Sequence, residues 1–205
     1  MRVAIVGGTG SFGRALAKRL GELGTDEVVV GSRDVDRARA TAEELGVDGA
    51  VNQDAVRDAD LVVLAVKSDA TLQTASELAD AIGTTPVLCV ASDLRFTAEG
   101  VLPGRHQGSL AEEVARMVRA PVASGFQSFA AANVIEGDPG DALICGENSE
   151  AKTRALELAG RLGARAIDVG PLANSRALEG MTAVILNVNK RYKAHAGIRL
   201  TGIPD

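Results

Sequence analysis

Residues 3–13 read Val3-Ala4-Ile5-Val6-Gly7-Gly8-Thr9-Gly10-Ser11-Phe12-Gly13, a short apolar run that passes directly into a cluster of glycines. The last six residues match the pattern G-x-G-x-x-G, which is informative when a strand precedes it and a helix follows. Both conditions hold here, because the apolar run has the length of a strand and because Phe12, Leu16 and Leu20 recur at helical spacing. The stretch therefore predicts a strand, a tight turn and a helix packed back on the strand.

The predicted turn also offers a place for a pyrophosphate. Glycine lets the backbone approach the anion closely and lets the helix pack against the strand. The backbone N–H groups of residues 9–12 would point at the anion from the positive end of the helix dipole. The predicted cofactor contacts are Gly8, Thr9, Gly10, Ser11, Phe12 and Gly13. The alternative is a glycine-rich turn that binds no ligand.

The end of the second predicted strand, Gly31-Ser32-Arg33-Asp34, indicates which dinucleotide is bound. Enzymes that use NAD usually place a carboxylate at the strand tip, where it binds the ribose 2′-hydroxyl. Ser32 and Arg33 offer instead a hydroxyl and a guanidinium suited to a 2′-phosphate, and Arg37 could add a second positive charge. The tip therefore favours NADP(H) over NAD(H). The alternative is that both arginines are ordinary exposed cations at a helix start.

The rest of the chain alternates between predicted strands and predicted helices. Strands are expected at residues 2–6, 27–30, 61–66, 86–90, 122–124, 142–145 and 165–169. Asp34 is placed to cap the second helix, and Gly24 is placed to end the first. Such alternation is typical of an α/β fold of the Rossmann type, with a doubly wound, mainly parallel sheet and right-handed crossovers.

Two later segments are less regular. Residues 91–108 are rich in glycine and contain Pro103, so they are expected to form a loop. Pro171 is expected to open a long final helix that reaches Val188. We expect a division near residue 120, with a dinucleotide-binding domain over residues 1–120 and a small C-terminal α/β lobe over residues 121–205.

Composition excludes several classes of function. The chain has 205 residues, of which 46% are hydrophobic and 2% aromatic, and its formal net charge is −5. So few aromatic rings and so acidic a balance argue against a nucleic-acid partner. Two cysteines and two histidines are too few for an ordinary metal site, and they fit a reducing cytoplasm. The apolar runs are shorter than a signal peptide or a membrane span requires, so a soluble protein is expected.

Side chains for acid–base or nucleophilic catalysis do not stand out. There is no G-x-S-x-G motif, and the acidic residues are scattered over predicted helix faces. Hydride transfer between two redox coenzymes tolerates this, because the protein need only bring the two reactive carbons together and exclude water. No catalytic side chain is therefore predicted.

Four segments in the right order resemble the NADPH-dependent reductases of the deazaflavin coenzyme F420. They are Val3–Gly10, Val30–Arg33, Gly170–Ser175 and Asn189–Gly197, and the resemblance extends over almost the whole chain. It implies hydride transfer between the nicotinamide C4 of NADP(H) and C5 of F420. It also implies a homodimer, with the deazaflavin in a cleft formed with the C-terminal lobe.

The resemblance also implies particular contacts. Thr9, Ser32, Arg33 and Arg37 match the family's NADP contacts, and Val66, Lys67 and Ala91 occupy the ends of the next strands. The predicted deazaflavin contacts are Gln127, Ser128, Phe129, Ala196 and Gly197. The chain departs from the family pattern around this second pocket, for example at Lys67-Ser68 and at Gln127. Two other functions therefore stay open: an imine or keto-acid reductase that uses NADP, and an NADPH-binding regulatory module.

Overall fold

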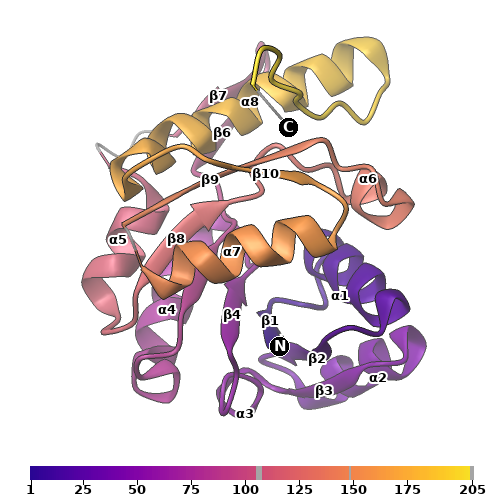
Figure 1. Ribbon diagram of the computed structural model, residues 1–205, viewed down its shortest axis with the longest axis vertical. Helices are drawn as coiled ribbons and strands as arrows, with labels where there is room; N and C mark the ends of the chain where they lie inside the picture. Colours follow the sequence, from indigo (N-terminus) through magenta and orange to yellow (C-terminus); the bar gives the residue numbers. More distant parts are fainter. Residues whose placement is uncertain (105–107, 148, 204–205) are drawn as a thin grey trace.

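The computed structural model describes residues 1–104, 108–147 and 149–203 (Figure 1). Eight strands form one sheet in the order β10-β9-β8-β5-β4-β1-β2-β3. These strands are β1 (Arg2–Val6), β2 (Glu27–Ser32), β3 (Asp48–Val51), β4 (Leu61–Leu64), β5 (Val87–Cys89), β8 (Val122–Gly125), β9 (Asp141–Gly146) and β10 (Arg165–Asp168). The helices are α1 (Ser11–Leu23), α2 (Val35–Leu45), α3 (Asn52–Ala55), α4 (Ser68–Ile82), α5 (Leu110–Met117), α6 (Ala131–Glu136), α7 (Glu150–Arg161), a 3-10 turn η1 (Leu172–Asn174) and α8 (Ser175–Tyr192).

The centre of the sheet is parallel. Val3 of β1 lies between Val28 of β2 and Leu61 of β4, and the register continues along the three strands. These strands are apolar on both faces because helices cover both faces. The predicted α/β fold with a doubly wound, mainly parallel sheet is confirmed.

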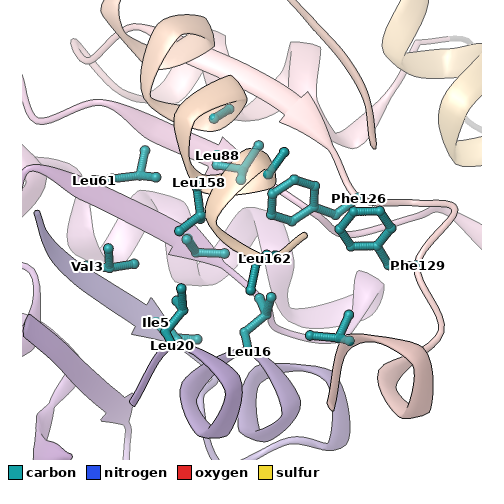
Figure 2. Close-up of a cluster of buried hydrophobic side chains, with 14 of the residues drawn as sticks. Val3, Ile5, Leu16, Leu20, Leu61, Leu88, Phe126, Phe129, Leu158 and Leu162 are labelled. Carbon is teal, nitrogen blue, oxygen red and sulfur yellow. The ribbon is translucent and has the colours of Figure 1, made fainter. Parts of the chain in front are cut away.

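Two hydrophobic layers hold the helices against the sheet. On one face, α1 packs over β1 and β2, and α7 packs over β8 and β9. Leu16 and Leu20 of α1 share a core with Leu158 of α7 and with Leu162 (Figure 2). On the other face, α4 and α5 form the second layer. The predicted helix ends are confirmed, because the Asp34 side chain caps α2 and Gly24 ends α1 in the left-handed conformation, with φ 62°.

The strands after residue 120 join the same sheet. β8 pairs in parallel with β5, whereas β9 runs antiparallel to β8 and β10 runs parallel to β9. We call the edge where β1, β2, β4, β5 and β8 end the carboxyl edge. Because of the reversal, β9 and β10 begin at this edge. The helix α8 contacts β8 and β9, and Figure 1 shows it beyond the sheet, beside β6 and β7.

Two expectations about local structure are wrong. Residues 94–103, expected to be part of a loop, form a hairpin of β6 (Leu94–Thr97) and β7 (Gly100–Pro103), in which Gly100 turns the chain with φ 144°. Residues 105–107 of the expected loop lie outside the described residues. The final helix does not begin at Pro171, because η1 intervenes and α8 runs from Ser175 to Tyr192. Among the described residues, no helix combines the length and apolar character needed to cross a membrane.

Candidate functional site at the carboxyl edge

The glycine turn after β1 is built by backbone contacts. Gly7 adopts φ 83°, and its N–H and that of Gly8 both donate to the carbonyl oxygen of Gly31 at 3.1 Å. A β-carbon on Gly13 would lie 2.6 Å from the Gly7 oxygen, so α1 can start here only with glycine at position 13. A β-carbon on Gly10 would meet only that oxygen, at 3.3 Å, which leaves the outer side of the turn open to a ligand. Gly7 lies outside the G-x-G-x-x-G match and was not among the predicted contacts.

Backbone donors gather at this turn. Among the described residues, the N–H groups of Thr9, Ser11 and Phe12 have no hydrogen-bond acceptor. The Gly10 N–H is an exception to the expectation for residues 9–12, because it donates to the Gly7 oxygen at 2.9 Å. Three free donors at the start of a 13-residue helix suit the oxygens of a pyrophosphate.

The end of β2 places a hydroxyl and two guanidinium groups near the turn. Ser32 is buried, and its Oγ accepts a hydrogen bond from the Asp34 N–H at 3.2 Å. Arg37 reaches back from α2, so that its Nη2 lies 3.5 Å from the Thr9 oxygen. Arg33 is exposed and forms no ion pair within the described part of the chain.

The carboxylate that follows Ser32 and Arg33 is already engaged. Asp34 accepts hydrogen bonds from the N–H groups of Asp36 and Arg37, at 3.0 and 3.1 Å. Its charge therefore caps α2 and leaves Arg33 unpaired. A hydroxyl and two arginines without a competing carboxylate suit a 2′-phosphate.

Sequence reasoning missed one polar residue close to this tip. Asn52, the first residue of α3, is 8% exposed, and its Oδ1 has no hydrogen-bond partner in the described part of the chain. That oxygen lies 2.9 Å from where a Gly31 β-carbon would be. A buried acceptor without a donor beside a nucleotide-binding strand tip is suited to a ligand N–H. No motif marks Asn52, because it follows the short edge strand β3, which the apolar pattern does not predict.

The next strand ends continue the same edge. The Ala65 N–H donates to the Val6 oxygen and the Val90 N–H to the Leu64 oxygen, so residues 65–66 and 90–91 follow the glycine turn in register. Val66 is half-buried, and its Cγ1 lies 2.8 Å from where a Gly7 β-carbon would be. Lys67 is exposed and Ala91 is buried. The structure therefore brings the predicted nucleotide contacts together along one edge.

The predicted second pocket begins where β8 ends. Gln127 is 6% exposed, and its Nε2 donates to Ser124 Oγ at 2.8 Å and to the Cys89 oxygen at 3.4 Å. Its Oε1 has no hydrogen-bond partner among the residues that the structure describes. Phe129 stacks on Phe126 with ring centroids 4.7 Å apart (Figure 2). The Phe129 ring is therefore part of the core, and only its backbone is left to contact a ligand.

The C-terminal segment returns to this end of β8. The Ala196 N–H donates to Asn189 Oδ1 at 2.6 Å, and a β-carbon on Gly197 would lie 3.0 Å from the Pro139 oxygen. Farther along, the Ile198 oxygen accepts a hydrogen bond from the Asp141 N–H at 2.7 Å. Asp141 in turn accepts from Ser128 Oγ through its own carbonyl oxygen, at 3.1 Å. The structure thus connects Ser128 to Ile198, the residue after Gly197, through Asp141.

The helix α8 contributes two polar side chains that the sequence analysis did not single out. Thr182 Oγ1 donates to the Gln127 oxygen at 3.1 Å and lies 2.8 Å from Ser92 Oγ. Glu179 is 3% exposed and accepts hydrogen bonds from the backbone N–H groups of Asp93 and Ala111. Burial raises the pKa of Glu179 to about 7, and the nearby Asp93 charge adds to this effect. The sequence feature that could have identified Glu179 is a carboxylate placed among the apolar residues of the final helix.

A cavity of about 530 Å³ opens beside Glu179. Its walls come from the end of the β6–β7 hairpin and the first half of α8, and they include Asp93, Arg176 and Gly180.

Both buried cysteines lie near this region, and burial raises the pKa of Cys89 and Cys145 to about 12. Their thiols stay protonated at neutral pH and do not act as nucleophiles.

The parallel sheet, the glycine turn and the basic tip of β2 define a dinucleotide-binding protein of the Rossmann class. The sequence model of the family described as NADP oxidoreductase, coenzyme F420-dependent, matches residues 2–91. An F420-dependent NADP reductase of Methanothermobacter thermautotrophicus is 34% identical over 231 residues, covering 100% of this chain and 97% of that protein. One of Methanocaldococcus jannaschii is 33% identical over 224 residues, covering 99% of each. The chain belongs to the family of F420-dependent NADP oxidoreductases.

Solved structures show the same fold. A protein of Arthrobacter sp. FB24, described as a candidate F420-dependent NADP reductase, superposes with a TM-score of 0.84 at 23% identity, covering 100% of both chains. A pyrroline-5-carboxylate reductase of Coxiella burnetii superposes with a TM-score of 0.64 at 16% identity, covering 94% of this chain and 70% of that one. At these identities the likeness concerns the fold.

Proposed function

We propose that this protein is an oxidoreductase that transfers a hydride between NADP(H) and the deazaflavin coenzyme F420. The observation that carries the proposal is the meeting of two sets of unpaired polar groups at one carboxyl edge. Within the described residues, the free N–H groups of Thr9, Ser11 and Phe12 suit the pyrophosphate of NADP, and Arg33, which forms no ion pair there, suits its 2′-phosphate. The buried, unpartnered Oε1 of Gln127 lies near the end of β8, on the same edge. Full-length likeness to F420-dependent NADP reductases supports the same assignment.

The coenzymes supply the chemistry when they are bound, since the hydride passes from one ring carbon to the other. The protein's part is to bind, orient and exclude water. The NADP contacts we propose are Gly8, Thr9, Gly10, Ser11, Phe12, Gly13, Ser32, Arg33, Arg37, Val66, Lys67 and Ala91, together with Asn52. The F420 contacts we propose are Gln127, Ser128, the Phe129 backbone, Ala196 and Gly197. Residues 1–120 would then hold NADP, and residues 121–205 would complete the deazaflavin cleft.

We also propose a homodimer in the cytoplasm. The surface that supports the dimer is a stripe on α8 formed by Val184, Val188 and Tyr192, which follow one another at four-residue spacing and are 62%, 36% and 70% exposed. A stripe on one helix can pair with its own copy about a twofold axis. The two reduced cysteines, Cys89 and Cys145, support the cytoplasm.

The function is tested by mixing the protein with NADPH and oxidised F420 and following the loss of the visible absorbance of the deazaflavin. Enzyme-dependent bleaching, with NADP⁺ formed in equal amount, is the expected result. Binding of NADPH without bleaching would contradict the proposal and favour a regulatory module. Oxidation of NADPH by a cyclic imine or a keto acid, but not by F420, would favour the other reductase.

A further inference from the structure

We infer that Asp141 is a positioning residue for the second coenzyme, because it ties the C-terminal segment 196–200 to the residues that follow β8. The inference rests on the proposed function and deepens it. It assigns to one buried carboxylate the task of holding two separate parts of the F420 contact surface in a fixed relation. Asp141 itself lies outside both sets of proposed contacts.

The carboxylate of Asp141 is buried and fully engaged. Asp141 is 1% exposed, although its partner Arg165 and the tail residue Leu200 both reach solvent. Arg165 donates twice, from Nε to Oδ1 at 3.2 Å and from Nη2 to Oδ2 at 2.7 Å. The Leu200 N–H donates to Oδ2 at 2.5 Å, and Arg165 Nη2 also donates to the Leu200 carbonyl oxygen. The ion pair therefore binds both the N–H and the carbonyl oxygen of one tail residue, Leu200.

The backbone of Asp141 makes the other two connections. Its N–H donates to the Ile198 oxygen at 2.7 Å, and its carbonyl oxygen accepts from Ser128 Oγ at 3.1 Å. This is possible because β9 runs antiparallel to β8, so that the first residue of β9 lies beside the segment after β8. The backbone of Asp141 thus contacts both the tail, at Ile198, and the segment after β8, at Ser128.

The tail between these anchors contains Ala196 and Gly197. On the N-terminal side, Asn189 Oδ1 accepts the Ala196 N–H and Asn133 Nδ2 donates to the His195 oxygen at 2.6 Å. On the C-terminal side, Asp141 holds Ile198 and Leu200. Residues 194–203 form no helix or strand. Their backbone groups are therefore bound by these separate contacts in place of regular secondary-structure hydrogen bonds. Loss of the Asp141–Leu200 bond therefore weakens the hold on the C-terminal side of Ala196 and Gly197.

The neighbours of Asp141 favour its charged form. Hydrogen bonding by Arg165 lowers the pKa of this carboxyl, and the Leu200 N–H and the charge of Arg199 act in the same direction. A charge-assisted bond to a backbone N–H is among the stronger hydrogen bonds in proteins. The experiment therefore targets the Asp141–Leu200 hydrogen bond.

The test removes one N–H from the tail. Leu200→Pro deletes the donor to Asp141 at an exposed position and leaves the Asp141–Arg165 pair intact, whereas Leu200→Ala keeps the donor and removes the side chain. We expect Leu200→Pro to raise the KM for F420 about tenfold, to leave the KM for NADPH within about twofold, and to speed hydrogen exchange of residues 196–200. Leu200→Ala should resemble the wild type in all three measurements. Asp141→Asn, which weakens the same anchor, should also raise the KM for F420.

Three outcomes would overturn the inference. The first is a Leu200→Pro protein whose tail exchanges fast while its KM for F420 stays at the wild-type value. The second is an equal rise of both KM values, which indicates general destabilisation. The third is equal behaviour of Leu200→Pro and Leu200→Ala. Absence of F420 turnover in the wild type is a separate result. It would reject the proposed function and, with it, the positioning role of Asp141.

Discussion

A β-carbon at position 13 would lie 2.6 Å from the carbonyl oxygen of Gly7 and 2.7 Å from the Cα of Gly8. Both neighbours are backbone atoms, so no side chain can move aside to make room. The turn and the first residues of α1 therefore keep their arrangement only while position 13 has no side chain.

Gly13→Ala is expected to force α1 away from β1, with a loss of about 2 kcal/mol in the free energy of unfolding and a clear loss of NADPH binding. Gly10→Ala is the matched control, because its β-carbon meets only one atom, at 3.3 Å, on the open side of the turn. Gly10→Ala should weaken NADPH binding while costing less than about 1 kcal/mol of stability. Denaturant unfolding and NADPH fluorescence titration measure the two effects, and equal stability losses in both variants would contradict the prediction.

Arg33→Ala is expected to raise the Kd for NADPH about tenfold or more, because it removes charge-assisted hydrogen bonds to the 2′-phosphate. The Kd for NADH, which lacks this phosphate, should stay unchanged. Arg39→Ala is the control, since Arg39 is a nearby exposed arginine, located on α2. The difference between the Kd values for NADPH and NADH should become smaller as the salt concentration increases. An equal effect of Arg33→Ala on NADPH and NADH would show that Arg33 does not contact the 2′-phosphate.

Glu179 predicts a particular dependence of stability on pH. Its pKa is raised from 4.5 to about 7 in the folded protein, mainly by burial. The folded state therefore holds this proton more tightly than the unfolded state, so the stabilisation is complete below pH 4.5 and is lost as pH rises through 7. We expect the free energy of unfolding to fall by about 3 kcal/mol from this group across that interval. Urea unfolding at several pH values should show this decrease in the wild type and not in Glu179→Gln. The same dependence of the free energy of unfolding on pH in both proteins would refute the prediction.

Val184→Asp is expected to convert the proposed dimer into a monomer, because it places a charge in the middle of the apolar stripe on α8. Met117→Asp adds the same charge at a 40% exposed apolar residue of α5 and should leave the dimer intact. Sedimentation equilibrium distinguishes the two masses. A wild-type monomer, or a dimer that survives Val184→Asp, would show that the stripe is not the interface.

The nucleotide half was largely predictable because its signals are local. The strand, glycine turn and helix of residues 2–23 follow from neighbouring residues, and so does the cap at Asp34. The hairpin at 94–103 was missed because Gly100 and Pro103 were interpreted as loop residues, whereas Gly100 makes the tight turn and Pro103 ends the edge strand β7. The edge strand β3 was missed because it carries Gly49 and little apolar character.

The second half of the site depends on contacts between residues far apart in the chain. Asp141 and Leu200 are 59 residues apart, and no periodicity or motif relates them. Glu179 is separated from the Asp93 N–H that it binds by 86 residues. The predictions for Gln127, Ala196 and Gly197 came from family likeness and stay predictions. The structure adds the contacts of these residues, such as Gln127 with Ser124 and Ala196 with Asn189.

The β5–β8 ladder, in which Val87 pairs with Val122, makes the two halves of the chain one continuous piece of hydrogen-bonded sheet. A hinge motion of one half against the other would have to break that ladder in the middle of the core. The position of the end of β8 relative to the glycine turn is therefore established when the protein folds. Adjustment on binding is left to side chains and to the C-terminal segment, whose sequence can change to suit a different acceptor without disturbing the nucleotide turn.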